Sequence, residues 1–153
     1  MRYENKRVDE LLAYFDQRTA KSRLPRRSDI HPQDLKRYLP EIFIFGTQYD
    51  HAGHLSDLIV QLMGTTVAGF YGEITGQTVT AGAPSPQVAE RILISCRRAL
   101  ETRQPIVAEA AAFSEQKNHL RVRVLYVPLS EDGTNIDRIF GHVHVGLRSE
   151  TNS

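Results

Sequence analysis

The feature that most constrains this chain is a cluster of glycines directly after a strand-like segment. Five of the ten glycines fall between Gly64 and Gly82. The segment before them, residues 57–63, reads DLIVQLM and is typical of a strand. Glycine gives the backbone the freedom that tight turns need, so we expect short turns and short helices here. The cluster lacks the lysine and the long following helix of a phosphate-binding loop, which argues against nucleotide binding.

The overall composition fits one domain in a reducing compartment. A chain of 153 residues with 41% hydrophobic content can build a single core. The 19 basic residues against 18 acidic ones do not favour general nucleic-acid binding. Cys96 is the single cysteine, which excludes an internal disulfide. No signal segment or membrane-length apolar run is found, so we expect a cytoplasmic protein that binds neither membranes nor nucleic acid.

Residues 1–23 are expected to form an N-terminal helix and a basic linker. Apolar residues at helical spacing predict an amphipathic helix over residues 8–18. A helix this short is rarely stable alone, so its apolar stripe must rest on the domain or on a second copy of the chain. The stretch that follows is basic and broken by proline. We interpret its charged groups as a solvated linker: Lys21, Arg23, Arg26, Arg27 and, further along, Lys36.

Two more helices and five strands are expected. A small helix within residues 28–41 begins near Pro32, and the longest helix runs from Ser85 to Arg103. The predicted strands are residues 42–45, 58–63, 106–113, 120–129 and 136–147. This order predicts an α+β fold in which helical connectors cover one face of the sheet.

Two motifs resemble those of stand-alone bacterial PAS proteins. The chain reads LPRRSDIHPQDLKRYLPEIFIF from Leu24, similar to LPxRxDxxPxxLxxxLPxIFI. It reads QLMGTTVAGFYGEITGQTV from Gln61, similar to RLxGTxxxxxxGxxxTGxxL. The likeness extends to Gly146 and predicts a PAS-like domain over 24–148, with a disordered tail at 149–153. Gln61 departs from the pattern, which commonly has an arginine near this position.

The resemblance implies a five-stranded antiparallel sheet in the order 2-1-5-4-3, with a cavity between the sheet and its helices. It also implies a non-catalytic sensory role, through a small ligand or a signalling partner protein. A completely filled core would instead suit a pure protein-interaction module. The residues that we expect to face the helices and line a pocket are Leu58, Val60, Leu62, Phe70, Tyr71, Ile92, Cys96, Val122, Val124, Tyr126, Val143 and Val145.

The opposite sheet face carries too many apolar residues to be left uncovered, with Ile59, Met63, Leu125 and Phe140 among them. We expect the N-terminal helix of a partner subunit, or one shared in a symmetric homodimer, to cover it. The signalling partner is unidentified. The predicted interface residues are Val8, Leu11, Leu12, Phe15, Gln61, Arg121, Arg123, His142 and His144.

No metal or coloured cofactor is expected. Two histidine pairs, His51 with His54 and His142 with His144, lack a clear third ligand, although Glu109 is within reach of the second pair. The long helix contains no histidine to bind a haem iron. Cys96 lies in ISCRRAL, at a core-facing position, and not in the reactive setting of flavin-binding light sensors. Binding of an uncoloured organic ligand is an alternative that the sequence leaves open.

The sequence contains none of the common catalytic motifs. One enzymatic alternative is a cone-shaped isomerase with Tyr71, Glu73 and Thr75 beside a cavity. Glu73 has no paired acid or oxyanion donor at a recognisable spacing. We therefore predict that the protein is not an enzyme.

Overall fold

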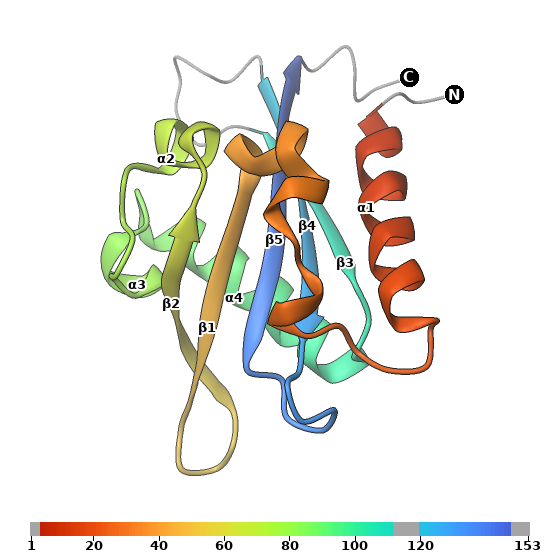
Figure 1. Ribbon diagram of the computed structural model, residues 1–153. Helices are drawn as coiled ribbons and strands as arrows, with labels where there is room; N and C mark the ends of the chain where they lie inside the picture. Colours follow the sequence, from red (N-terminus) through yellow and green to blue (C-terminus); the bar gives the residue numbers. More distant parts are fainter. Residues whose placement is uncertain (1–3, 112–119, 148–153) are drawn as a thin grey trace.

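Five antiparallel strands form one sheet in the order β2-β1-β5-β4-β3 (Figure 1). This confirms the expected α+β fold and strand order. The computed structural model describes residues 4–111 and 120–147, so the predicted tail and residues 112–113 of the third predicted strand lie outside the described residues. The elements in chain order are α1 (Glu4–Thr19), η1 (Arg27–Asp29), η2 (Pro32–Glu41), β1 (Ile42–Tyr49), β2 (Leu55–Met63), α2 (Thr65–Tyr71), α3 (Val79–Gly82), α4 (Pro86–Thr102), β3 (Ile106–Ala111), β4 (Leu120–Leu129) and β5 (Arg138–Leu147).

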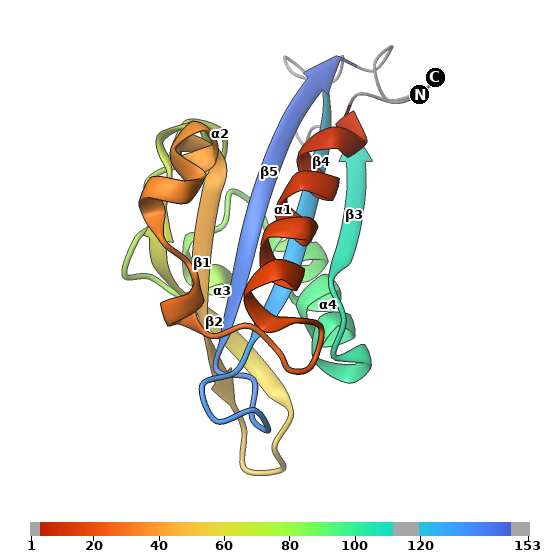
Figure 2. The ribbon, with the colours of Figure 1, turned by 45° about the vertical axis from the view of Figure 1, so that its right-hand side comes forward.

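Helices cover both faces of the sheet. The helices α2, α3 and α4 pack on one face, here called the inner face (Figure 1). The helix α1 and the 3-10 segment η2 cover the other, here called the outer face (Figure 2). Among the described residues, no helix has both the length and the hydrophobicity needed to cross a lipid bilayer.

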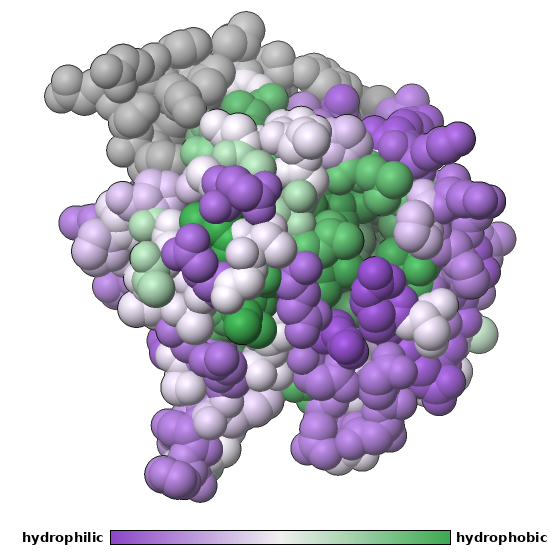
Figure 3. Space-filling model, turned by 60° about the vertical axis from the view of Figure 1, so that its left-hand side comes forward, coloured by the Kyte–Doolittle hydropathy of each residue, from purple (hydrophilic) through white to green (hydrophobic). Residues whose placement is uncertain are grey.

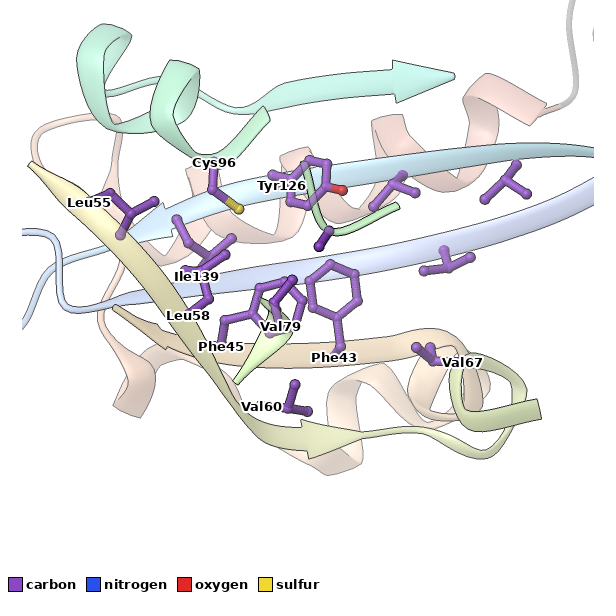
Figure 4. Close-up of a cluster of buried hydrophobic side chains, with 14 of the residues drawn as sticks. Phe43, Phe45, Leu55, Leu58, Val60, Val67, Val79, Cys96, Tyr126 and Ile139 are labelled. Carbon is purple, nitrogen blue, oxygen red and sulfur yellow. The ribbon is translucent and has the colours of Figure 1, made fainter. Parts of the chain in front are cut away.

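The core on the inner face is built around two neighbouring aromatic side chains of β1. The ring centroids of Phe43 and Phe45 are 4.4 Å apart, and Tyr126 of β4 meets Phe43 edge-on at 5.9 Å (Figure 4). The Phe43 ring lies directly over Gly141 of β5, and a Cβ at Gly141 would overlap the ring. This glycine is therefore needed for the close approach of the aromatic ring.

The outer face is covered by α1 of the same chain. Val8, Leu11 and Phe15 are buried. Phe15 packs edge-on against Phe140 of β5, with ring centroids 5.0 Å apart. The helix is longer than predicted, and its apolar stripe rests on its own domain. The outer face was expected to be covered by the helix of a partner subunit or by one shared in a homodimer, whereas here the helix of the same chain covers it.

The predicted orientation of two residues on β2 is wrong. Regular alternation would place Leu62 on the inner face and Met63 on the outer face. The pairing with β1 skips from Leu62 to Val60, so Gln61 is the extra residue of a β-bulge, and the alternation is reversed beyond it. Met63 consequently packs against the inner core, while Leu62 is 38% exposed. Seen from the β2 side, the surface carries apolar areas bordered by polar side chains (Figure 3).

Both ends of α4 are fixed by specific hydrogen bonds. At its start, the Ser85 hydroxyl accepts a hydrogen bond from the Val88 backbone N–H at 3.3 Å, as the sequence predicts. Its last turn is followed by Arg103 in the left-handed conformation, with φ of 54°. The Arg103 guanidinium donates to the carbonyl oxygens of Gly133 and Thr134, at 3.0 and 2.9 Å. The end of the helix is thereby tied to the loop between β4 and β5.

The glycine cluster forms two short helices, α2 and α3, and the turns around them. Two of its glycines have positive φ, Gly72 at 92° and Gly76 at 89°. An L-residue with a side chain rarely adopts these angles, so the expected need for backbone freedom is confirmed at these two positions.

Arg23 is not part of a solvated linker, contrary to the prediction. Its guanidinium binds the Asp29 carboxylate through Nη1–Oδ2 and Nη2–Oδ1 contacts of 2.8 and 3.2 Å. The Arg26 backbone N–H donates to the same carboxylate at 2.8 Å. The hydrogen bond from Arg23 is the main reason why the pKa of Asp29 lies below its ordinary value. The side chains of Lys21 and Lys36 are exposed, as expected.

Replacing Gly141 by alanine should strongly destabilise the domain, because the added methyl group must displace the Phe43 ring. We expect a loss of about 3 kcal/mol or more in the free energy of unfolding, measured by urea denaturation. The matched control is Gly69→Ala in α2, where no atom lies within 4 Å of the added Cβ. That variant should be neutral or more stable by about 0.5–1 kcal/mol. Equal stability of the two variants would contradict the packing role of Gly141.

The Asp29 contacts should make stability depend on pH in the acid range. A carboxyl group whose pKa is lowered on folding stabilises the protein above its unfolded value of about 3.9 and loses this effect as the pH falls through the lower folded value. Asp29→Asn should therefore cost about 1–2 kcal/mol at pH 7, and the difference from the wild type should shrink below about pH 4. Thermal unfolding across this pH range measures it.

The control for this experiment is Asp16→Asn. The Asp16 side chain is 52% exposed, and its oxygen lies 3.9 Å from Lys21 Nζ. Such a surface pair contributes little to stability. If Asp16→Asn lost as much stability as Asp29→Asn, the forked contact between Asp29 and Arg23 would contribute no more than an ordinary surface ion pair.

Candidate ligand cavity

A cavity of about 250 Å³ lies between α4, the end of α2 and the inner face of β3 and β4. Its walls are mostly apolar. The described residues that line it are Phe70, Tyr71, Val88, Arg91, Ile92, Ile94, Ser95, Ala108, Glu109, Ala110, Val122, Val124 and Tyr126. This cavity is the candidate functional site of the domain.

The cavity brings together only some of the residues that were predicted to line a pocket. The predicted residues that line the cavity are Phe70, Tyr71, Ile92, Val122, Val124 and Tyr126. The others belong to the inner core without lining the cavity: Leu58, Val60, Cys96, Val143 and Val145. Leu62 lies on the outer face because of the bulge at Gln61.

Sequence reasoning missed one edge of α4 and most of β3. Two sides of α4 face the rest of the domain: Val88, Arg91 and Ser95 line the cavity, while Cys96 is fully buried in the core. Apolar periodicity alone favours the core stripe. The two small residues Ala108 and Ala110, two apart on β3, were the available signal for an unfilled volume.

Three hydroxyl groups are set into the apolar wall, on Tyr71, Ser95 and Tyr126. Burial raises the pKa of Tyr71 to about 12, although the positive charge of Arg91 opposes the shift. Burial also raises the pKa of Tyr126 well above its ordinary value, against a hydrogen bond with the Ser95 hydroxyl. Both phenols are protonated at neutral pH, as ordinary tyrosines are, and each can act as a hydrogen-bond donor.

Two charged residues occur among the described residues that line the cavity, Arg91 and Glu109. The Glu109 carboxylate is paired with Arg123, whose Nε lies 3.1 Å from Glu109 Oε2. Because Glu109 and Arg123 are register partners, this pair lies on the outer face of the sheet. Arg91 thus supplies a positive charge on the cavity side that this carboxylate does not neutralise.

A second and much smaller cavity, of about 20 Å³, adjoins the first toward β1. Tyr71, Ile92, Val124 and Tyr126 line both cavities and form the partition between them. Movement of these side chains would join the two volumes and bring the aromatic rings of β1 within reach of a ligand.

Cys96 is fully buried, as predicted for a small apolar residue. Burial raises the pKa of its thiol, so the thiolate is not formed at neutral pH. It lines neither cavity.

The predicted interface residues on the sheet are held within the chain. His142 is 1% exposed, and its Nε2 lies 2.8 Å from Glu41 Oε1, which also lies 3.7 Å from Arg7 Nε. Burial of Glu41 would raise its pKa, but the hydrogen bond from His142 and the nearby positive charges outweigh this and lower it. His144 is buried on the same face, and Arg121 is half-buried.

A hydrogen bond made by Gln61 explains why a glutamine suits this position, where the motif commonly has an arginine. Its Oε1 accepts a hydrogen bond from Arg138 Nε at 3.1 Å. An arginine at position 61 has no acceptor atom and would oppose the charge of Arg138.

Of the polar groups considered for metal binding and catalysis, the two histidine pairs and Glu73 do not line the cavity, whereas Tyr71 and Glu109 do. Within the described residues, no three or more His, Cys, Asp or Glu side chains gather as a metal site. His51 and His54 are exposed in a turn, where His54 Nδ1 is 4.0 Å from Asp50. Glu73 is bound to the Thr75 hydroxyl and backbone N–H, and these hydrogen bonds lower its pKa. Neither cavity is lined by Glu73.

Three solved structures are similar to this chain, and the first of them shows the same fold. A light-oxygen-voltage domain from a study of a flavin analogue is 13% identical, with a TM-score of 0.50 over 76% of this chain and 84% of that chain. The PAS domain of a protein from Colwellia psychrerythraea is 17% identical, with a TM-score of 0.48 over 76% and 96%. A sensory box sensor histidine kinase from Vibrio cholerae is 16% identical, with a TM-score of 0.45 over 75% and 88%.

A comparison with curated proteins found no match. The sequence model of the PAS domain family matches residues 3–144, a region that includes α1 and all five strands up to residue 144. Together with the strand order 2-1-5-4-3, this match shows that the chain belongs to the PAS domain family.

Proposed function

We propose that this protein is a non-catalytic sensory domain that binds a small ligand in the cavity beneath α4 and signals through its surface. Membership of the PAS family supports the sensory role. The observation that carries the proposal is an apolar volume of about 250 Å³ with a few hydroxyl groups in its wall. Binding sites for small molecules typically combine these two features.

The volume of the cavity limits the size of the ligand that can bind. Sites for drug-sized molecules measure about 300–1,000 Å³, and a cavity of about 150 Å³ holds benzene. A volume of about 250 Å³ therefore suits a one- or two-ring compound or a short aliphatic chain. We expect neither haem nor a flavin adduct, because α4 offers no histidine and the Cys96 thiol lies outside the cavity lining.

Strand β4 offers a route from the cavity to the surface. Its residues Val122, Val124 and Tyr126 line the cavity, while Leu125 and Val127, between and beyond them, belong to the core under α1. A ligand that displaces the first set moves the second, because the two sets alternate along one backbone. We propose that occupancy of the cavity changes the docking of α1 and thereby the choice of partner.

We further propose that the protein acts as a homodimer, joined through α1 and the outer face of the sheet. The buried residues of α1 already pack against the sheet of their own chain. A dimer contact would therefore form through apolar residues of α1 and of the outer face that are still exposed or half-buried. Leu12 is half-buried, and Val107, on the outer face of the edge strand β3, is 48% exposed. The signalling partner would then bind the same region.

Filling the cavity should abolish ligand binding. Ala108→Phe places an aromatic ring in the volume now bounded by Ala108 and α4. Native mass spectrometry of freshly purified wild-type protein should show a retained small molecule, and the variant should lack it. A ligand added at about 100 times its Kd should stabilise the wild type by about 2.7 kcal/mol and leave the variant unchanged. Hydrogen exchange in α1 should change on binding in the wild type alone.

The control is Ala52→Phe, at an exposed position in the turn between β1 and β2. This variant should bind the ligand as the wild type does. Ligand binding that persists in Ala108→Phe would contradict the assignment of the cavity. A wild type that retains no ligand and responds to none would instead favour a pure protein-interaction module.

The proposed homodimer can be tested by measuring the mass of the protein in solution. Multi-angle light scattering of the purified chain should give twice the mass of 17.3 kDa. Val107→Lys should shift the population toward the monomer, because a buried and unpaired charge disfavours the interface. A monomer at the highest concentration that can be reached would remove this part of the proposal.

A further inference from the structure

We infer that the ligand of the cavity is a small amphipathic acid, with an apolar body held under α4 and an anionic group bound by Arg91. This inference rests on the proposed function, since it names the chemistry of the ligand for that same cavity.

The first argument is that, among the described residues, the charged side chains around the cavity leave one positive charge without a neutralising partner. Arg91 lines the cavity and is an exposed residue, so it stands at the edge of the volume next to solvent. The carboxylate of Glu109 is held by Arg123 and does not neutralise it. On α4, the positions three and four residues away from Arg91 on either side hold no acidic residue. Among the described residues, no ion pair to Arg91 is formed.

The hydrogen-bonding groups are the second argument. The Tyr71 and Tyr126 side chains line the cavity, and their hydroxyls are protonated at neutral pH like those of any ordinary tyrosine. Together with Ser95, they give the wall donors that suit an oxygen acceptor. A carboxylate accepts several hydrogen bonds and pairs with a guanidinium in a forked geometry, whereas an ammonium group would be repelled by Arg91.

The apolar walls are the third argument. Val88, Ile92, Val122 and Val124 surround the volume and can bind a ligand body that is largely hydrocarbon. A site of about 250 Å³ with one cation at its opening matches a medium-chain or aryl carboxylic acid.

The experiment uses two matched pairs of probes, in which the acid and its neutral counterpart share one body. The pairs are 2-naphthoate with 2-naphthamide, and octanoate with 1-octanol. Isothermal titration calorimetry on the full chain should show that at least one acid binds at least about 10-fold more tightly than its neutral counterpart. Arg91→Gln should weaken binding of that acid about 10-fold or more and leave the neutral compound unchanged. Arg91→Lys should restore part of the loss, because it keeps the charge.

The control variant is Arg98→Gln, an exposed arginine on the same helix that does not line the cavity. It should bind both members of each pair as the wild type does. Glutamine and arginine have similar helix propensities, so neither variant should disturb α4.

The outcomes separate this inference from the proposed function. If the neutral compounds bind as well as the acids, or if Arg91→Gln weakens acid binding no more than Arg98→Gln does, the inference is wrong. A neutral molecule retained in native mass spectrometry overturns it as well, while the ligand-binding role stands. If no probe binds, no ligand is retained and Ala108→Phe changes nothing, both proposals fail.

Discussion

The packing of the Phe43 ring onto Gly141 is the contact on which the interior of this domain depends. The two aromatic rings of β1 fill the inner face where β1 meets β5. Over the other half of the sheet, β3 presents the small side chains of Ala108 and Ala110 to the cavity. The interior is therefore filled on one side and open on the other. The position of the cavity, beneath α4 and next to β3, follows from this uneven distribution of side-chain volume.

The two faces of the sheet have different roles, and β4 belongs to both. Its inward side chains form the wall of the cavity, and its outward ones support α1. Polar contacts on the outer face, such as Glu41 with His142, add orientation to the apolar packing of the helix. Strand β4, which lies between β5 and the edge strand β3, therefore contributes side chains to both cores.

Much of this arrangement can be predicted from the sequence, because it follows from periodicity and turn chemistry. The helix over 85–103 and the need for a cover on the outer face are of this kind, whereas the strand order was expected from the resemblance to PAS proteins, and the chain that supplies the cover was not identified by the pattern. The side chains beyond Gln61 were placed on the wrong faces, since a bulge is set by pairing with another strand and leaves no clear local pattern. Arg23 was taken for a solvated residue because its partner Asp29 is brought to it by the fold of the loop. Arg91 and Ser95 were missed because cavity edges do not follow apolar spacing.

The left-handed arginine at the end of α4 has a mechanical consequence. The Arg103 side chain donates hydrogen bonds to the loop between β4 and β5. In the same half of the helix, Arg97 donates to the Leu55 carbonyl oxygen. The cavity is lined by the other half, from Val88 to Ser95. The helix is thus tied to the sheet and its loops by its C-terminal half, while its N-terminal half borders the cavity. Pressure from a bound molecule would therefore act on the half of the helix that begins at Ser85.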